Sequence, residues 1–197
     1  MCPYRQLPLP FPYRPGFAEA DFLPAQSNED ARAWLQRPLD WPDRRLALWG
    51  QAGCGKTHLL TIWAARTGAD LLSGAALRDF PARPDAPALA VDDADMMSGE
   101  EPLLHLLNAA ADARAPVLLT GRTPPARWPV RLPDLASRLR AVTAVEIHPP
   151  EDSLLRALLA RLLLERQVAV TDTVQEWLLL RLPRTQAALR EAVARLD

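Results

Sequence analysis

Lysine is almost absent from this 197-residue sequence: of 23 lysines and arginines, only Lys56 is a lysine. A GC-rich coding bias would account for the arginines without any functional cause. Cysteine is also scarce, with Cys2 near the start of the sequence and Cys54 in a glycine-rich stretch. Two cysteines in such places predict neither a disulfide framework nor a metal cluster, so both thiols are expected to be reduced.

Long apolar runs are missing as well. No stretch approaches the roughly 20 apolar residues that a membrane-spanning helix needs, and the start of the sequence lacks the features of a signal peptide. The net charge of -1 argues against nucleic acid as the main ligand, although Arg44 and Arg45 form a local basic cluster. These absences predict a cytoplasmic protein with no membrane partner.

Hydrophobic residues make up 49% of the sequence, enough to bury one substantial core. Short apolar runs alternate with helical periodicity, which predicts α/β architecture with a parallel sheet covered on both faces. A capping box at 27–30 predicts a short helix that ends near Pro38, and further helices are expected from Lys56 to near Gly68 and around 103–110. The expected strands are 45–49, 69–72, 88–91, 116–120 and 144–147.

The sequence divides into three predicted parts. Residues 1–16 are rich in proline, which removes backbone donors and fixes φ, so they are expected to form an extended tail. Residues 17–150 carry the alternating strands and helices of an α/β domain. Residues 151–197 show only helical periodicity and predict a small all-helical lid.

A phosphate-binding loop is predicted where the first strand ends. The G-x-x-x-x-G-K-T pattern lies between an expected strand and an expected helix, which is the context that the motif requires. It consists of Gly50, Gln51, Ala52, Gly53, Cys54, Gly55, Lys56 and Thr57. Glycines let backbone N–H groups approach phosphate, Lys56 reaches the β and γ oxygens, and Thr57 can ligate Mg²⁺. The motif predicts a bound purine nucleotide, either ADP or ATP.

Two acidic residues follow the apolar strand that ends near Val91. We expect Asp92 to hold Mg²⁺ through water, and Asp93 to orient or activate an attacking water. Acids at a strand end can also serve only as caps or turn formers.

These motifs together resemble the AAA+ module of the bacterial initiator DnaA. The similarity rests on 55–60 (G-K-T-H-L-L), on Asp92-Asp93 and on 147–151 (I-H-P-P-E), and it covers nearly the whole chain after the tail. It implies a P-loop AAA+ three-layer parallel sheet with a small all-helical C-terminal lid. It also implies that His58 contacts the nucleotide, and that the segment containing Phe22 and Leu23 borders the adenine.

Residues 132–139 (L-P-D-L-A-S-R-L) are closer to DnaA-related regulators of the Hda type. The resemblance implies that Arg138 is an arginine finger for a neighbour's γ-phosphate, with Arg140 as the nearby competitor. It implies that Arg184 is the lid arginine called sensor 2, which contacts the nucleotide, although the preceding Pro183 departs from the pattern. Arg122 is a second departure, because relatives carry an acid there, and it predicts slow intrinsic hydrolysis.

The tail resembles a peptide of the form Q-L-x-L-P-[LF], which binds the DNA polymerase III β sliding clamp. The matching residues are Gln6, Leu7, Leu9, Pro10 and Phe11. Gln6 would donate or accept a hydrogen bond at one pocket, while Leu9 and Phe11 would fill an apolar cleft. The alternative is a proline-rich end with incidental leucines.

The leading interpretation is a replisome-associated negative regulator of replication initiation. It would dock on the clamp and stimulate ATP hydrolysis by DnaA through Arg138, without direct sequence-specific DNA binding, since no helix-turn-helix domain follows the lid. A self-contained AAA+ ATPase such as a DnaC-type helicase loader is the main alternative, and a P-loop small-molecule kinase is a third. Self-association as a homo-oligomer stays open.

Overall fold

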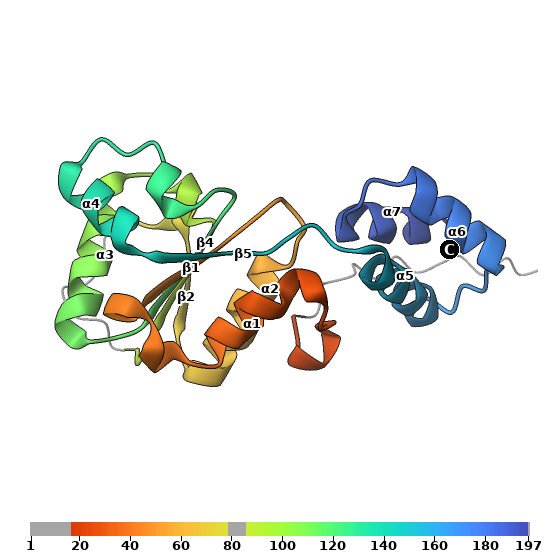
Figure 1. Cartoon of the computed structure of the whole chain (residues 1–197), viewed down its shortest axis with the longest axis horizontal. Helices are drawn as coiled ribbons and strands as arrows, with labels where there is room; N and C mark the ends of the chain where they lie inside the picture. The colour runs from red at the N-terminus through yellow and green to blue at the C-terminus, as the bar shows by residue number, and fades with distance from the viewer. Residues whose placement is uncertain (1–16, 79–85, 197) are drawn as a thin grey trace, which may run out of the picture.

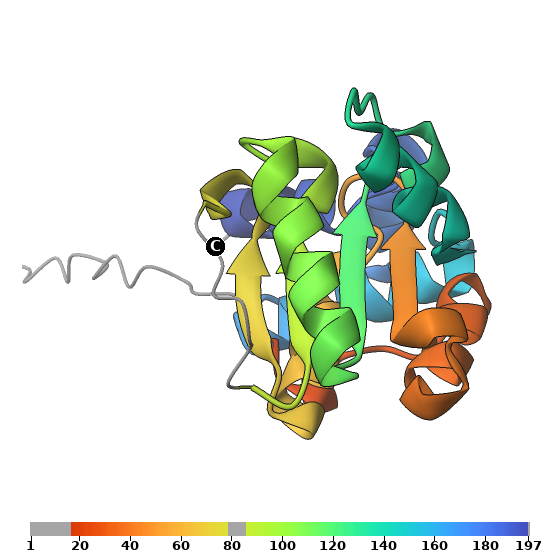
Figure 2. The same cartoon turned by 90° about the vertical axis from the view of Figure 1, so that its left-hand side faces the viewer.

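A five-stranded parallel sheet forms the centre of the chain, in a computed structural model that describes residues 17–78 and 86–196. The strand order is β2-β3-β4-β1-β5, and all strand pairs are parallel, as the arrowheads at one edge in Figure 2 show. The strands are β1 (Arg45–Trp49), β2 (Asp70–Ser73), β3 (Leu89–Asp92), β4 (Val117–Gly121) and β5 (Thr143–Glu146). Each begins and ends within one residue of its predicted bounds.

Helices cover both faces of the sheet and produce three layers (Figure 1). α1 (Glu29–Leu35) and α2 (Lys56–Thr67) lie on one face, and α3 (Glu100–Ala113) and α4 (Pro133–Ala141) lie on the other. Because both faces are covered, the central strands are mostly apolar, and every residue of β4, the polar Thr120 included, is buried. The α/β class and the three-layer parallel sheet that the sequence predicted are therefore confirmed.

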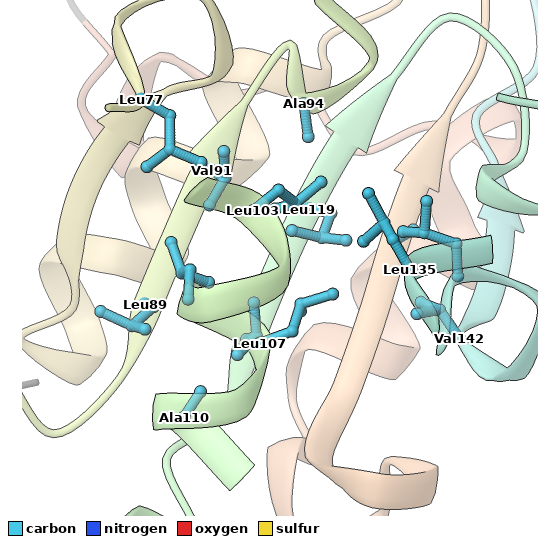
Figure 3. Packing of buried hydrophobic residues seen from close by; sticks show 14 of the residues in the cluster. Leu77, Leu89, Val91, Ala94, Leu103, Leu107, Ala110, Leu119, Leu135 and Val142 are labelled. Carbon is cyan, nitrogen blue, oxygen red and sulfur yellow. The ribbon is translucent and has the colours of Figure 1, made fainter. Parts of the chain in front are cut away.

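Alternate residues of the strands supply two separate cores. Val91, Leu119 and Leu107 belong to the cluster beneath α3 and α4 (Figure 3). Leu48 and Trp63 belong to the cluster beneath α1 and α2, where the Trp63 ring stacks on the Trp41 ring with the centroids 5.3 Å apart. Loss of a buried leucine from either cluster would cost roughly 2–5 kcal/mol.

Three helices follow the sheet and form the lid: α5 (Asp152–Glu165), α6 (Asp172–Arg181) and α7 (Gln186–Leu196). They enclose an apolar cluster of their own, in which Leu155, Leu159 and Leu189 are almost fully buried. Figure 1 shows this unit beyond the carboxyl end of β5, next to α2 and the segment before α1.

The capping box expected at 27–30 is wrong, because no side chain caps α1. The Asn28 side chain turns back instead: its Oδ1 accepts the Ala25 N–H at 3.1 Å and its Nδ2 donates to the Leu23 carbonyl at 3.1 Å. α4 was not predicted at all. Its nine residues begin at Pro133, and only Leu135 and Leu139 are buried, which is too little periodicity to mark a helix.

The tail predicted for residues 1–16 lies outside the described residues, and so do the residues expected to bind the clamp, Gln6, Leu7, Leu9, Pro10 and Phe11. Within the described ranges, no helix has the length and apolar character needed to cross a membrane.

Candidate nucleotide-binding site

The phosphate-binding loop lies between the end of β1 and the start of α2, and its backbone requires glycine. Gly50, Gly53 and Gly55 have φ of 153°, 80° and 103°, in the region that other residues rarely adopt. A Cβ added to Gly50 would lie only 2.4 Å from the Ile147 carbonyl oxygen. The loop therefore follows this path because it carries no side chain at these positions.

Lys56 is buried at the first turn of α2, with 6% of its surface exposed. Its Nζ donates hydrogen bonds to the Gly50 carbonyl at 2.8 Å and the Gln51 carbonyl at 3.0 Å, and it lies 3.8 Å from Cys54 Sγ. No carboxylate pairs with Lys56 in the described part of the chain. A buried ammonium without a carboxylate partner favours the arrival of an anion, and phosphate fits the surrounding backbone.

A hydroxyl and a carboxylate meet at the adjacent strand end. Thr57 Oγ1 donates to Asp92, at 3.0 Å from Oδ2 and 3.2 Å from Oδ1. Hydroxyl and carboxylate oxygens are ligands that Mg²⁺ accepts, usually beside waters and phosphate oxygens. No group of three His, Cys, Asp or Glu side chains that could hold a metal occurs in the described ranges, so a cation here would need those additional ligands.

Thr120, one residue before the end of β4, contacts both acids of the site. Its fully buried hydroxyl donates to Asp92 Oδ1 at 2.6 Å and accepts the Asp93 N–H at 2.8 Å. Asp93 has a left-handed backbone with φ of 47°, which turns the chain sharply after β3. Thr120 therefore fixes the carboxylate of Asp92 and the backbone of Asp93 at once.

Asp93 has a perturbed carboxyl group. Partial burial, followed by the negative charges of Asp92 and Asp95, raises the pKa of Asp93 above its ordinary value, whereas Lys56 and Arg122 oppose the shift. A carboxyl whose pKa rises becomes a better proton acceptor once it is ionised. The backbone N–H of Arg122 donates to Asp95 Oδ2 at 2.8 Å, which places Arg122 beside this acidic group.

His58 holds the segment before α1 against the phosphate-binding loop. Its Nε2 lies 3.0 Å from the Ala18 carbonyl oxygen. Its ring packs in T-shaped, edge-to-face contacts with Phe17 and Phe22, at centroid distances of 5.5 and 5.2 Å. Phe22, Leu23 and His58 line one cavity of about 40 Å³ together with the loop and the lid. Its other lining residues include Gly53, Cys54, Pro150, Leu154 and Gln186.

The lid contacts the same segment through Arg161. Its guanidinium pairs with Asp21, donates to the Ala20 carbonyl at 3.2 Å and pairs with Glu165 at 2.9 Å. These partners raise the pKa of Arg161, with the Glu165 hydrogen bond as the largest cause. The small cavity is therefore bounded by three parts of the chain that lie far apart in sequence.

Neither of two predicted site arginines lines this cavity. Arg184 pairs with Asp152 Oδ1 at 2.6 Å and donates at 3.3 Å to the carbonyl of Pro150, which is a lining residue of the cavity. Arg138 lies with Arg45 near the other edge of the sheet, where the strands begin. Contact of Arg184 with a nucleotide, and the finger role of Arg138, stay predictions.

Two residues of this region were missed in the sequence. Thr120 was expected only as part of the strand-end sensor segment with Gly121 and Arg122, and its contacts with Asp92 and Asp93 were not foreseen, although it lies one residue before the end of the strand beside β3. Glu151 accepts the Gln26 N–H at 3.1 Å, and hydrogen bonds, first from its own backbone, lower the pKa of its carboxyl. Glu151 thereby joins the start of the lid to the segment before α1.

Comparison with known proteins gives structural matches but no sequence family, since no family model matches the chain. The structure resembles domain III of the replication initiation protein DnaA from Thermotoga maritima, with a TM-score of 0.73, 19% identity, and coverage of 93% of this chain and 88% of that one.

Two other matches are larger proteins. AMPPCP-bound DnaA from Aquifex aeolicus matches with a TM-score of 0.71 and 17% identity, over 90% of this chain but 63% of that one. The RuvB Holliday junction branch migration motor of Thermotoga maritima has a TM-score of 0.60 and 22% identity, over 87% of this chain and 61% of that one. At such identities the likeness shows the fold alone. The chain has the P-loop AAA+ fold, a parallel sheet covered by helices, and three further helices follow the sheet.

Proposed function

We propose that this chain is a nucleotide-bound regulator of replication initiation, which supplies Arg138 in trans to ATP held by a DnaA-type initiator. ADP or ATP with Mg²⁺ would lie on its own P-loop and set its conformation. Hydrolysis on the initiator would then inactivate that partner. The fold it shares with DnaA domain III supports this choice over other P-loop functions.

The position of Arg138 carries the proposal. Arg138 lines a cavity that includes Arg45, the first residue of β1, whereas the phosphate-binding loop follows the last residue of that strand. The four residue steps between Arg45 and Trp49 span about 13 Å, so Arg138 faces away from the chain's own nucleotide site. Its guanidinium has no ion pair or hydrogen bond among the described residues, and this leaves it available to a phosphate on another molecule.

The chain's own residues would act as a holding site. Lys56 would exchange the carbonyls of Gly50 and Gln51 for phosphate oxygens, and the loop N–H groups would complete the cradle. Thr57 and Asp92 would hold Mg²⁺, which neutralises phosphate charge when bound. Arg122 beside Asp93 and Asp95 replaces an acid at the sensor position, which favours slow turnover here.

An ATPase assay on the initiator tests the finger. The full chain, clamp loaded on DNA and ATP-bound DnaA are combined, and phosphate release is followed for the original protein and for Arg138→Ala and Arg140→Ala. An arginine finger is worth roughly 10³–10⁵ in rate, so Arg138→Ala should reduce the stimulated rate to DnaA's own. Arg140, exposed on the same helix, is the matched control and should leave the stimulation intact. Undiminished stimulation by Arg138→Ala would refute the assignment.

The tail is tested separately. Deletion of residues 6–11 should abolish binding to the β clamp in a surface-binding measurement, whereas nucleotide affinity should stay unchanged because the loop at 50–57 is intact. Clamp affinity that survives the deletion would show that the tail is not the docking peptide.

A self-contained ATPase of the helicase-loader class is the second candidate. It is favoured by Asp93, whose raised pKa and proximity to Asp92 fit a residue that activates water. Multiple turnovers by the isolated protein, together with binding to single-stranded DNA on a filter, would favour this function over the regulator.

A further inference from the structure

A cavity of about 510 Å³ opens at the edge of the sheet where the strands begin. Four arginines line it, Arg44, Arg45, Arg114 and Arg138, with Asp43 as the one acid and alanines as the other lining residues. The lining charge is therefore four positive minus one negative, or three positive. In Figure 2 this is the edge opposite the arrowheads, where α3 also ends, so the cavity is separate from the phosphate-binding loop.

Arg45 is the deepest of these cations, with 6% of its surface exposed. One of its guanidinium nitrogens, Nη2, donates to the Leu107 carbonyl at 3.1 Å, and no carboxylate forms an ion pair with it in the described part of the chain. Burial lowers the pKa of Arg45, the charge of Arg138 lowers it further, and Asp43 opposes both. Like charges are thus brought together here with too little negative charge to balance them.

The backbone around the cavity has an unusual conformation for arginine. Asp43, Arg44 and Arg114 have φ of 48°, 54° and 54°, and they are three of the five non-glycine residues with positive φ in the described ranges. Arg114 ends α3 in a left-handed position that glycine fills at lower energy. Arg44 Nη1 donates to the Arg114 carbonyl at 2.9 Å, which joins the two turns. The sequence places arginine where folding alone would favour glycine or asparagine.

We propose that this cavity binds the polyphosphate tail of a second nucleotide, with Arg44, Arg45 and Arg114 acting beside Arg138. Guanidinium groups bind phosphate oxygens in pairs, and several of them around one cavity suit a tail that carries three or four negative charges. That this nucleotide belongs to a partner rests on the proposed function, whereas the cavity's affinity for polyphosphate does not.

The first experiment isolates the cavity from the P-loop. Lys56→Ala removes the P-loop cation in the full chain, and inorganic tripolyphosphate is titrated at low ionic strength by calorimetry. Saturable binding of one tripolyphosphate to the Lys56→Ala protein is the expected result. If tripolyphosphate fails to bind Lys56→Ala up to millimolar concentration, the proposal is overturned.

A glycine substitution then tests the arginines without risk to the fold. Adding Arg114→Gly to Lys56→Ala should weaken tripolyphosphate binding at least about tenfold, because it removes one charged partner. Gln167→Gly is the matched control: Gln167 has a nearly identical φ of 57° and ends a lid helix. Both glycine variants should raise the melting temperature, but only Arg114→Gly should weaken the binding. Equal affinities in the two variants would also overturn the proposal.

The DnaA assay distinguishes two sources of the bound polyphosphate: a nucleotide held by a partner protein, or free nucleotide. If the ligand is held by a partner, Arg114→Gly in the otherwise unaltered chain lowers the stimulated hydrolysis, and Gln167→Gly does not. A second outcome is that neither the original protein nor any variant stimulates DnaA, while tripolyphosphate still binds Lys56→Ala. In that case the cavity is a site for free nucleotide: the proposed function is refuted, but the cavity's affinity for polyphosphate is not.

Discussion

Replacement of Thr120 by valine should destabilise the protein by about 3 kcal/mol. The two side chains are nearly the same size, but valine has no hydroxyl for Asp92 and Asp93. Thr120 is fully buried, and a valine methyl in place of its hydroxyl would leave the Asp93 amide and the Asp92 carboxylate without this partner.

The magnitude follows from the two hydrogen bonds. The 2.6 Å bond to the Asp92 carboxylate is charge-assisted, and such bonds contribute about 1.5–3 kcal/mol. The lower end of this range applies here, because Asp92 is only partly buried and keeps Thr57 as a partner. The Asp93 N–H would lose its acceptor at 2.8 Å, at a cost of about 1–3 kcal/mol. In a chain of this length, the total corresponds to a fall in melting temperature of roughly 6–12 °C.

Urea unfolding followed by circular dichroism measures the change, with Thr67→Val as the control. Thr67 only donates back to the Trp63 carbonyl within α2, at 2.9 Å, so its replacement should cost less than about 0.5 kcal/mol. A loss below about 1 kcal/mol for Thr120→Val, or an equal loss for both variants, would refute the view that Thr120 organises the acidic strand end.

Gly50→Ala should lower the free energy of unfolding by about 2 kcal/mol or more and abolish nucleotide binding, because its Cβ would lie 2.4 Å from the Ile147 carbonyl oxygen. In the control Gly99→Ala the Cβ would lie 3.4 Å from Pro102, so calorimetry should show nearly unchanged stability and nucleotide affinity. Glu100 accepts the N–H groups of Leu132 and Arg131, which lowers the pKa of its carboxyl below the ordinary 4.5. Its stabilisation is present above pH 4.5 and is lost as pH falls through the lowered value. The urea midpoint of Glu100→Gln should therefore lie below that of the original protein at pH 7, and the gap should close in acid; a gap that is constant with pH would contradict this.

Periodicity and the glycine motif were enough to predict the sheet. β1 and β4 are buried on both faces, so most of their residues are apolar, and such short apolar runs are easy to distinguish from loops. The G-x-x-x-x-G-K-T pattern specifies its own backbone, because Gly50, Gly53 and Gly55 are required by φ as well as by the ligand. Local sequence therefore determines both the strands and the phosphate-binding loop.

Side-chain partners could not be predicted in the same way, because they depend on tertiary distances. Asn28 was expected to help cap α1, but it bonds backward to Leu23 and Ala25, a choice that sequence spacing leaves open. The pairing of Arg184 with Asp152 and the gathering of Arg44, Arg45 and Arg114 around Arg138 arise from segments up to about a hundred residues apart. In a chain with this many arginines, only the fold distinguishes a clustered one from a solvated one.

The buried position of Lys56 also gives the protein a built-in probe of local opening. A lysine-specific protease has one cleavage site in this sequence, the peptide bond between Lys56 and Thr57. That bond lies in the first turn of α2, with its lysine side chain enclosed by loop carbonyls. Cleavage can therefore proceed only through molecules in which this turn has come apart, and the digestion rate, with and without nucleotide, reports how often that happens.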